Sequence, residues 1–453
     1  MNIILITVDC LRPDHLSCYG YDRKTSPNVD RLADTGIRFD QAIATGGWTQ
    51  PGIVSLLTST YPLMYEGCRK PLSDRRPSLL SALDKLGYAT VGFSTNPQVG
   101  SAFGYDRGFS AFEDLGPHRS EPSWYNMRGS ARLLQIPAVH SLLRTLGVPT
   151  LPPARACSAE VATERFCEWC DTADQPFFAW IHYMDAHFPY QVDRDLRSSQ
   201  RLAQSWRKLR ALYDSAAEGY AKHPGQQMLD LVIADYDRAI LYVDEQIGVL
   251  LNHLEKRNMD KQTAVIVTAD HGEMFFEHGC WSHRALYEEV VHVPLVVDVP
   301  GFRLGDKRSQ LVTFLDVAPT LIELLGAPQD PNMCGQSILR LFQADGEDLR
   351  DYAISELVMG RHDHHLSVRS RKHKYIYRMT GPRRYDCELY DLIDDPGEQR
   401  DLAGKRPVLA NEFQHLIDQH LESVQSTWER RLPDEQRVPE EVIARLRGLG
   451  YLD

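Results

Sequence analysis

Two polar segments that lie far apart in the chain carry side chains typical of divalent-cation sites. Asp9 follows the apolar run Ile3–Val8, and the pair Asp270-His271 follows Ala264–Thr268. Short apolar runs bounded by polar residues predict buried strands, and ligands in open α/β sheets bind beyond the carboxyl ends of such strands. We therefore expect the two carboxylates and the imidazole to share a cation at one sheet edge. On spacing alone, a capped turn and an ordinary loop remain an alternative.

A threonine at the start of a predicted helix has the chemistry of a nucleophile. Thr49 precedes Gln50 and Pro51, and the apolar stretch Pro51–Thr58 predicts a helix, because proline is favoured in a first helical turn. The hydroxyl would lie at the positive end of this helix, where a neighbouring cation would lower its pKa. Taken alone, Thr49 is better explained as an N-cap residue.

The elements that must position these side chains alternate between strand and helix. Such alternation predicts an α/β sandwich with a large mixed sheet between helices. The expected strands are 3–8, 37–44, 89–93, 177–183, 263–267 and 293–299, and the expected helices are 26–35, 51–58, 78–86 and 232–254.

Two parts of the chain depart from this alternation. Residues 98–160 are rich in Gly, Pro, Ser and Arg, and we expect an irregular insertion there. From about residue 350, short β runs (366–369, 374–378 and 388–392) precede a C-terminal helix. We therefore predict a catalytic α/β domain over residues 1–350 and a small α+β domain over residues 351–453.

Composition narrows the function classes. The chain has 453 residues with 43% hydrophobic residues, a net charge of -12 and a pI near 5.8. This acidic balance argues against broad nucleic-acid binding, which needs a basic face, but a local metal still permits a small anionic substrate. No window approaches the roughly 20 apolar residues of a membrane span. The first residues lack a basic leader, and the nine cysteines are scattered, so we expect a cytoplasmic enzyme with reduced thiols; the oligomeric state is left open.

A series of motifs, in order along the whole chain, resembles the sulfatase family of the alkaline-phosphatase superfamily. The motifs are Thr7–Gly20, Thr25–Ala33, Ser55–Pro62, His182–Tyr190, Thr268–Glu273, Glu277–Gly279, Tyr287–Glu289, Val293–Leu295, Asp316–Thr320, Tyr390–Leu392, Asp395–Pro396 and Leu446–Leu452.

The resemblance implies a fold and a set of site residues. It implies an alkaline-phosphatase-like sandwich with a small C-terminal domain, and a metal bound by Asp9, Asp270 and His271 with Thr49 beside it. It also implies that His187 contacts the substrate anion or its leaving oxygen, a role that suits an imidazole near neutral pH. A histidine in this metal shell favours manganese or zinc over calcium.

The chain departs from the sulfatase signature at the nucleophile. That signature has Cys or Ser, then Pro two residues later and Arg two residues after that, whereas this chain has Thr49, Pro51 and Ile53. Oxidation of a threonine would give a ketone rather than the aldehyde of formylglycine. The acid that follows the first aspartate is replaced by Cys10, and the family's first lysine falls near Asn96. These changes resemble the threonine-nucleophile branches that act on phosphate and phosphonate esters.

His283 occupies the position of the family's second lysine. We favour it as an anion contact or general acid; the alternative is a second metal held with His187, which the absence of a carboxylate at Cys10 weakens.

The leading hypothesis is a metal-dependent hydrolase that cleaves phosphate, phosphonate or sulfate esters through Thr49. A phosphotransferase or mutase with a phosphothreonine intermediate, and a non-catalytic protein of the same fold, are the alternatives.

Overall fold

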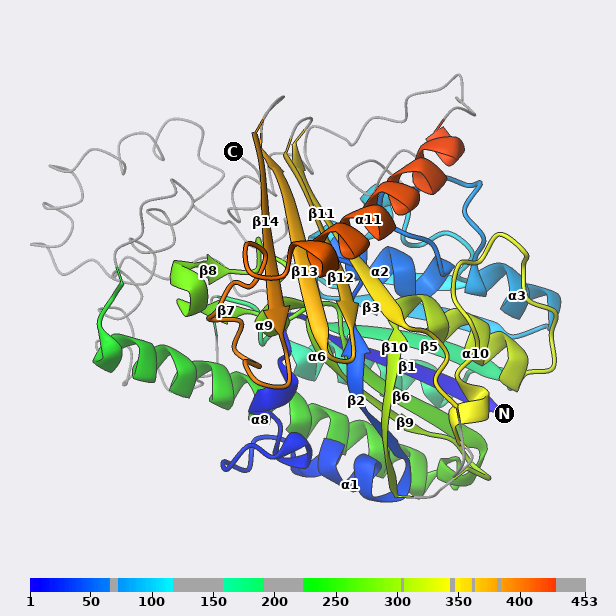
Figure 1. Ribbon diagram of the computed structural model, residues 1–453. Helices are drawn as coiled ribbons and strands as arrows, with labels where there is room; N and C mark the ends of the chain where they lie inside the picture. Colours follow the sequence, from blue (N-terminus) through cyan, green and yellow to red (C-terminus); the bar gives the residue numbers. More distant parts are fainter. Residues whose placement is uncertain are drawn as a thin grey trace, which may run out of the picture.

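The protein is built on an eight-stranded mixed sheet (Figure 1). The computed structural model describes residues 1–65, 72–116, 158–188, 190, 223–302, 305–342, 347–360, 363–380 and 384–428. The strand order is β10-β2-β9-β6-β1-β5-β3-β4, and β9 runs antiparallel to both of its neighbours while the other pairs are parallel. The strands are β1 (Asn2–Val8), β2 (Ile37–Ile43), β3 (Ala89–Ser94), β4 (Ala111–Asp114), β5 (Phe177–Tyr183), β6 (Thr263–Ala269), β9 (His292–Asp298) and β10 (Asp306–Thr313).

Helices cover both faces of this sheet, which is why its central strands are continuous apolar runs. Every residue of β1, β5 and β6 is buried. One face carries α1 (Pro27–Thr35), α6 (Ala159–Cys170) and α8 (Gln226–Lys256), and the other carries α2 (Thr49–Thr58), α3 (Leu79–Lys85) and α10 (Val317–Leu324) (Figure 1). The predicted α/β sandwich is confirmed.

A second, antiparallel sheet of four strands follows in the sequence. Its strands are β11 (Tyr352–Gly360), β12 (Asp363–Ser370), β13 (His373–Thr380) and β14 (Arg384–Asp391), paired in chain order. Helix α11 (Pro407–Trp428) packs on it through Phe413 and Ile417, which contact Val368 and Tyr375 in one apolar cluster. The small C-terminal sheet domain is thus confirmed as an element of the fold, whereas the boundary at residue 350 stays a prediction.

Three strands of these two sheets were not predicted from the sequence. β4 lies inside the segment expected to be irregular, where that expectation was wrong, because Ala111–Asp114 pairs with β3 at the edge of the sheet. β10 is an edge strand whose first half is polar, and β11 carries the buried polar residues Ser355 and Glu356. None of the three has the apolar pattern of a buried strand. The rest of the insertion, residues 117–157, and the motif Leu446–Leu452 lie outside the described residues.

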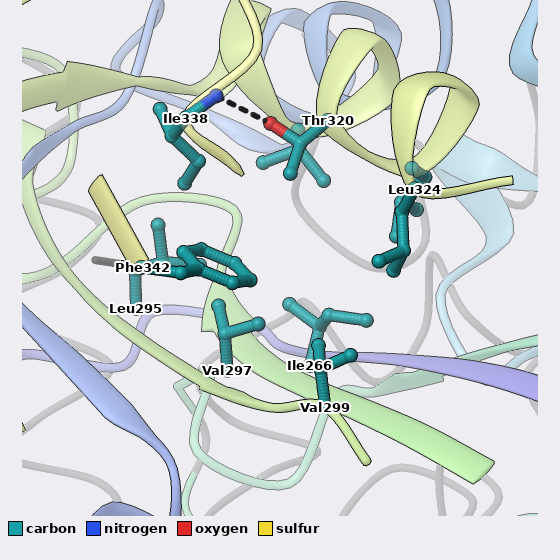
Figure 2. Close-up of a pocket in the computed structure, with 10 residues that line it drawn as sticks. Ile266, Leu295, Val297, Val299, Thr320, Leu324, Ile338 and Phe342 are labelled. Atoms are coloured by element: carbon teal, nitrogen blue, oxygen red, sulfur yellow. Dashed lines mark hydrogen bonds between the residues drawn. The ribbon is translucent and has the colours of Figure 1, made fainter. Parts of the chain in front are cut away.

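An apolar cavity of about 20 Å³ lies between α10 and the sheet (Figure 2). It is lined by Ile266, Val297 and Leu324 among others, and the hydroxyl of Thr320 at its edge accepts a hydrogen bond from the Ile338 amide. A volume of this size holds at most one water molecule, so the cavity is a packing feature. Among the described residues, no helix is both long and apolar enough to cross a membrane.

Candidate active site

Two neighbouring parallel strands bring the predicted metal ligands together. β1 pairs with β6 so that Val8 lies opposite Ala269, and the next residue on each strand is Asp9 and Asp270. The backbone amide of Cys10 donates to Asp270 Oδ1 over 3.2 Å, which joins the two loops at this edge. Asp9 and Asp270 are fully buried, as expected for side chains beyond the carboxyl ends of central strands.

Close packing of α2 places Thr49 beside these loops. Thr49 is the first residue of α2, and a Cβ atom at Gly52 would clash with the Asp270 carbonyl oxygen. Only glycine lets the first turn of the helix approach the Asp270 backbone this closely. The result is a distance of 3.5 Å from Thr49 Oγ1 to His271 Nε2.

The second sheet braces the loop that precedes Thr49. The hydroxyl of Ser355 on β11 donates to the Ala44 carbonyl over 2.6 Å, and the Glu356 amide donates to the Thr45 carbonyl over 2.8 Å. The C-terminal sheet therefore contributes to the position of Thr49 although it supplies none of the predicted site residues.

The imidazole of His271 is oriented as a metal ligand would be. Its Nδ1 donates to the Gly272 carbonyl over 2.8 Å, so the lone pair of the neutral ring is on Nε2. This nitrogen lies 3.6 Å from Asp9 Oδ1 and 3.5 Å from Asp270 Oδ2. Burial lowers the pKa of His271 well below its ordinary value, which favours the neutral form that binds metals.

The buried polar atoms of this centre fit a divalent cation. Asp9 Oδ1, Asp270 Oδ2 and His182 Nε2 are buried without a hydrogen-bond partner among the described residues, and ligand atoms of these three residues lie within 4.8 Å of one another. Burial and the nearby Asp9 raise the pKa of Asp270. Burial would also raise the pKa of Asp9, but neighbouring imidazoles, above all His187, hold it below its usual range. A cation would allow both carboxylates to stay ionised.

His187 and His283 lie at the same centre. Their ring centroids are 5.4 Å apart, and the His283 centroid is 4.4 Å from that of His271. His187 Nδ1 donates to the Phe188 carbonyl. The structure thus collects all six predicted site residues, and the roles assigned to them stay predictions.

Comparison with known proteins identifies the family of the chain. The sulfatase family model matches residues 1–327, about seven-tenths of the chain, and a model for the C-terminal part of N-sulphoglucosamine sulphohydrolase matches residues 276–427. The chain belongs to the sulfatase family. It is therefore an ester hydrolase of that family, and the recognition made from the motifs is confirmed at this level.

Individual relatives of this sulfatase-family enzyme are distant. N-acetylglucosamine-6-O-sulfatase of Bacteroides thetaiotaomicron is 22% identical, with 96% of this chain and 88% of that protein covered. Human arylsulfatase A is 25% identical, with 89% and 83% covered. A phosphonate monoester hydrolase of Agrobacterium radiobacter has the same fold, with a TM-score of 0.71 at 23% identity over 94% of this chain and 95% of that one.

Two residues of the candidate site were not among the predicted site residues. Asn96 Nδ2 donates to Asp9 Oδ2 over 2.7 Å and to Thr49 Oγ1 over 3.4 Å, so a neutral amide stands where the family's lysine was aligned. His182, on β5, lies 3.5 Å from Asp9 Oδ2 and 2.8 Å from the hydroxyl of Thr7. Asn96 was signalled only by that missing lysine, and His182 by its place one strand away from Asp9.

Proposed function

We propose that the protein hydrolyses phosphate, phosphonate or sulfate esters with Thr49 as the nucleophile and a divalent cation held by Asp9, Asp270 and His271. The observation that carries this proposal is the distance of 3.5 Å from Thr49 Oγ1 to His271 Nε2, the nitrogen that also faces both carboxylates. When bound there, the cation would lower the pKa of the threonine hydroxyl and stabilise the anionic oxygens of the substrate.

The remaining groups have defined tasks in this proposal. Asn96 donates to Thr49 Oγ1 and so orients the lone pair that attacks. The hydroxyl proton of Thr49 leaves to solvent, the threonine oxygen bonds to phosphorus or sulfur, and the bond to the leaving oxygen breaks. His187 or His283 donates a proton to that leaving oxygen. Water then cleaves the ester on Thr49 and releases the inorganic or phosphonic acid.

The residues around Thr49 favour phosphate and phosphonate esters over sulfate esters. A threonine cannot supply the aldehyde hydrate of the sulfatase signature, and the signature's arginine is replaced by Ile53, which is fully buried within α2. Among the relatives, both sulfatases and a phosphonate monoester hydrolase occur, which supports an ester of one of these acids.

Replacement of the nucleophile tests the proposal. We expect Thr49→Ala to lower kcat for a nitrophenyl phosphonate or phosphodiester by about a thousandfold or more, because the covalent step has no oxygen to form it. Thr49→Ser should keep part of the activity. The measurement is product release with manganese or zinc across a panel of phosphonates, phosphates and sulfates.

A matched control lies on the same helix. Thr58 ends α2, and its hydroxyl donates to the Val54 carbonyl, away from the cation ligands. Thr58→Val should therefore leave kcat within about twofold of the parent value. Retention of full activity in folded Thr49→Ala would exclude Thr49 as the nucleophile.

A further inference from the structure

A thiol lies in the middle of the active centre. Cys10 Sγ is 3.8 Å from His271 Nδ1 and 3.8 Å from His283 Nδ1, and Cys10 is fully buried. One ligand atom each of Cys10, His187 and His283 lies within 4.8 Å of the others. These three residues, which we call the thiol cluster, are therefore close enough to share a ligand.

The backbone holds this thiol in a strained conformation. Cys10 has a φ of 61°, in the left-handed region that is unfavourable for a side chain with a Cβ atom. Its carbonyl accepts a hydrogen bond from Tyr236 Oη over 2.6 Å, and its amide donates to Asp270. Strain that is maintained by surrounding contacts points to a functional constraint on this residue.

A third buried carboxylate, Glu273, lies at the centre beside Asp9 and Asp270. Glu273 is 1% exposed, neither of its carboxylate oxygens has a hydrogen-bond partner among the described residues, and Oε1 lies 3.5 Å from His283 Nδ1. In the described part of the chain, no lysine or arginine forms an ion pair with Asp9, Asp270 or Glu273. A buried carboxylate without a counter-charge is costly, so a third carboxylate calls for additional positive charge.

We propose that Cys10, His187 and His283 bind a second divalent cation, of the borderline-soft kind such as zinc, with Glu273 as the carboxylate that balances and orients His283. One sulfur and two nitrogen donors select zinc or cobalt over calcium or magnesium. Binding releases the thiol proton to solvent, since the thiolate is the ligand.

This second cation deepens the proposed function. The inference rests on that function, because it assumes a first cation at Asp9, Asp270 and His271. With both histidines bound to it, the second cation, rather than a proton from His187 or His283, would stabilise the leaving oxygen. The sequence alone weakened this arrangement because Cys10 replaces a carboxylate, but the structure directs the cysteine sulfur toward the histidine pair, where it serves as the third donor.

Cobalt titration of the full-length, metal-free protein tests this inference. We expect two equivalents of Co²⁺ to bind and a thiolate-to-cobalt charge-transfer band to appear in the near ultraviolet. Cys10→Ser should abolish the band and lower the binding to one tight equivalent. Cys334→Ser, at an exposed cysteine outside the cluster, should leave both the band and the stoichiometry unchanged.

Two further variants separate this inference from the proposed function. Asp270→Asn should lose one equivalent and keep the thiolate band, whereas Thr49→Ala should lose turnover and keep both. With folding verified by circular dichroism, a wild-type protein that binds one equivalent without a thiolate band, or a band that persists in Cys10→Ser, would overturn the second site. Loss of the second site with intact Thr49-dependent turnover would leave the proposed function standing.

Discussion

Two groups of buried carboxylates in this protein are neutralised in different ways. Between α9 (Glu288–Val291) and the C-terminal sheet, Lys374 Nζ lies 3.0 Å from Glu288 Oε1 and 3.1 Å from Glu398 Oε1. Arg369 adds a contact of 3.2 Å to Glu288 Oε2. We call these residues the junction cluster. At the active centre, by contrast, no lysine or arginine among the described residues forms an ion pair with Asp9 or Asp270, which lie beside imidazoles and amides.

The difference separates a structural cluster from a binding site. The junction cluster carries its own cations, so its charges are balanced by the polypeptide itself. The active centre has buried carboxylate oxygens without partners among the described residues, and a cation from solution would supply the balance. Similar burial of acidic side chains therefore has opposite consequences for metal dependence.

The largest effect on stability is expected at the junction cluster. Lys374→Met should lower the free energy of unfolding by about 3–5 kcal/mol, because removal of one partner leaves buried charges uncompensated. Urea denaturation measures this loss. Lys372→Met, two residues earlier at an exposed side chain, is the matched control and should cost less than about 1 kcal/mol. Equal effects of the two changes would contradict the comparison.

Cation binding at the active centre should stabilise the folded protein. A divalent cation present at about a hundred times its dissociation constant adds roughly 2.7 kcal/mol to the free energy of unfolding. We therefore expect manganese or zinc to raise Tm of the chelator-treated protein, and Asp270→Asn to reduce that rise strongly. A rise that is undiminished in Asp270→Asn would show that the cations bind elsewhere.

A smaller, pH-dependent effect sharpens the comparison at Glu398. Burial raises the pKa of Glu398 from 4.5 to about 7, against the opposing effect of Lys374. A carboxyl group with a raised pKa in the folded state contributes stability that is complete below pH 4.5 and is lost as the pH rises through 7. Glu398→Gln should therefore remove most of this pH-dependent loss of stability, because an amide does not titrate. Urea denaturation between pH 4.5 and 8 measures it; parallel pH profiles would contradict the assignment.

Much of the fold was predictable from local patterns. The apolar runs before Asp9 and Asp270 correspond to β1 and β6, and Pro51 and Gly52 mark the first turn of α2. Strands buried on both faces and helix starts have strong local signals. The edge strands β4 and β10 lack such a signal, because their pairing partners rather than their own apolar content make them strands.

The sequence predicted which residues form the site better than it predicted the role of each residue. Asp9, Thr49, His187, Asp270, His271 and His283 were all expected, and all lie at one centre. The threonine nucleophile, the identity of the metal, the alternative of a transferase and the cytoplasmic location stay predictions.

The amino-acid sequence by itself determined the α/β fold, the family, and which strand ends and helix start carry reactive side chains, because these depend on local patterns and ordered motifs. Only the tertiary structure decided that Asn96 and His182 reach Asp9, and that Cys10 lies between His271 and His283. Those contacts depend on strand order and on the approach of α2 to the Asp270 backbone. Residues more than eighty positions apart meet there, and no local pattern encodes their distance.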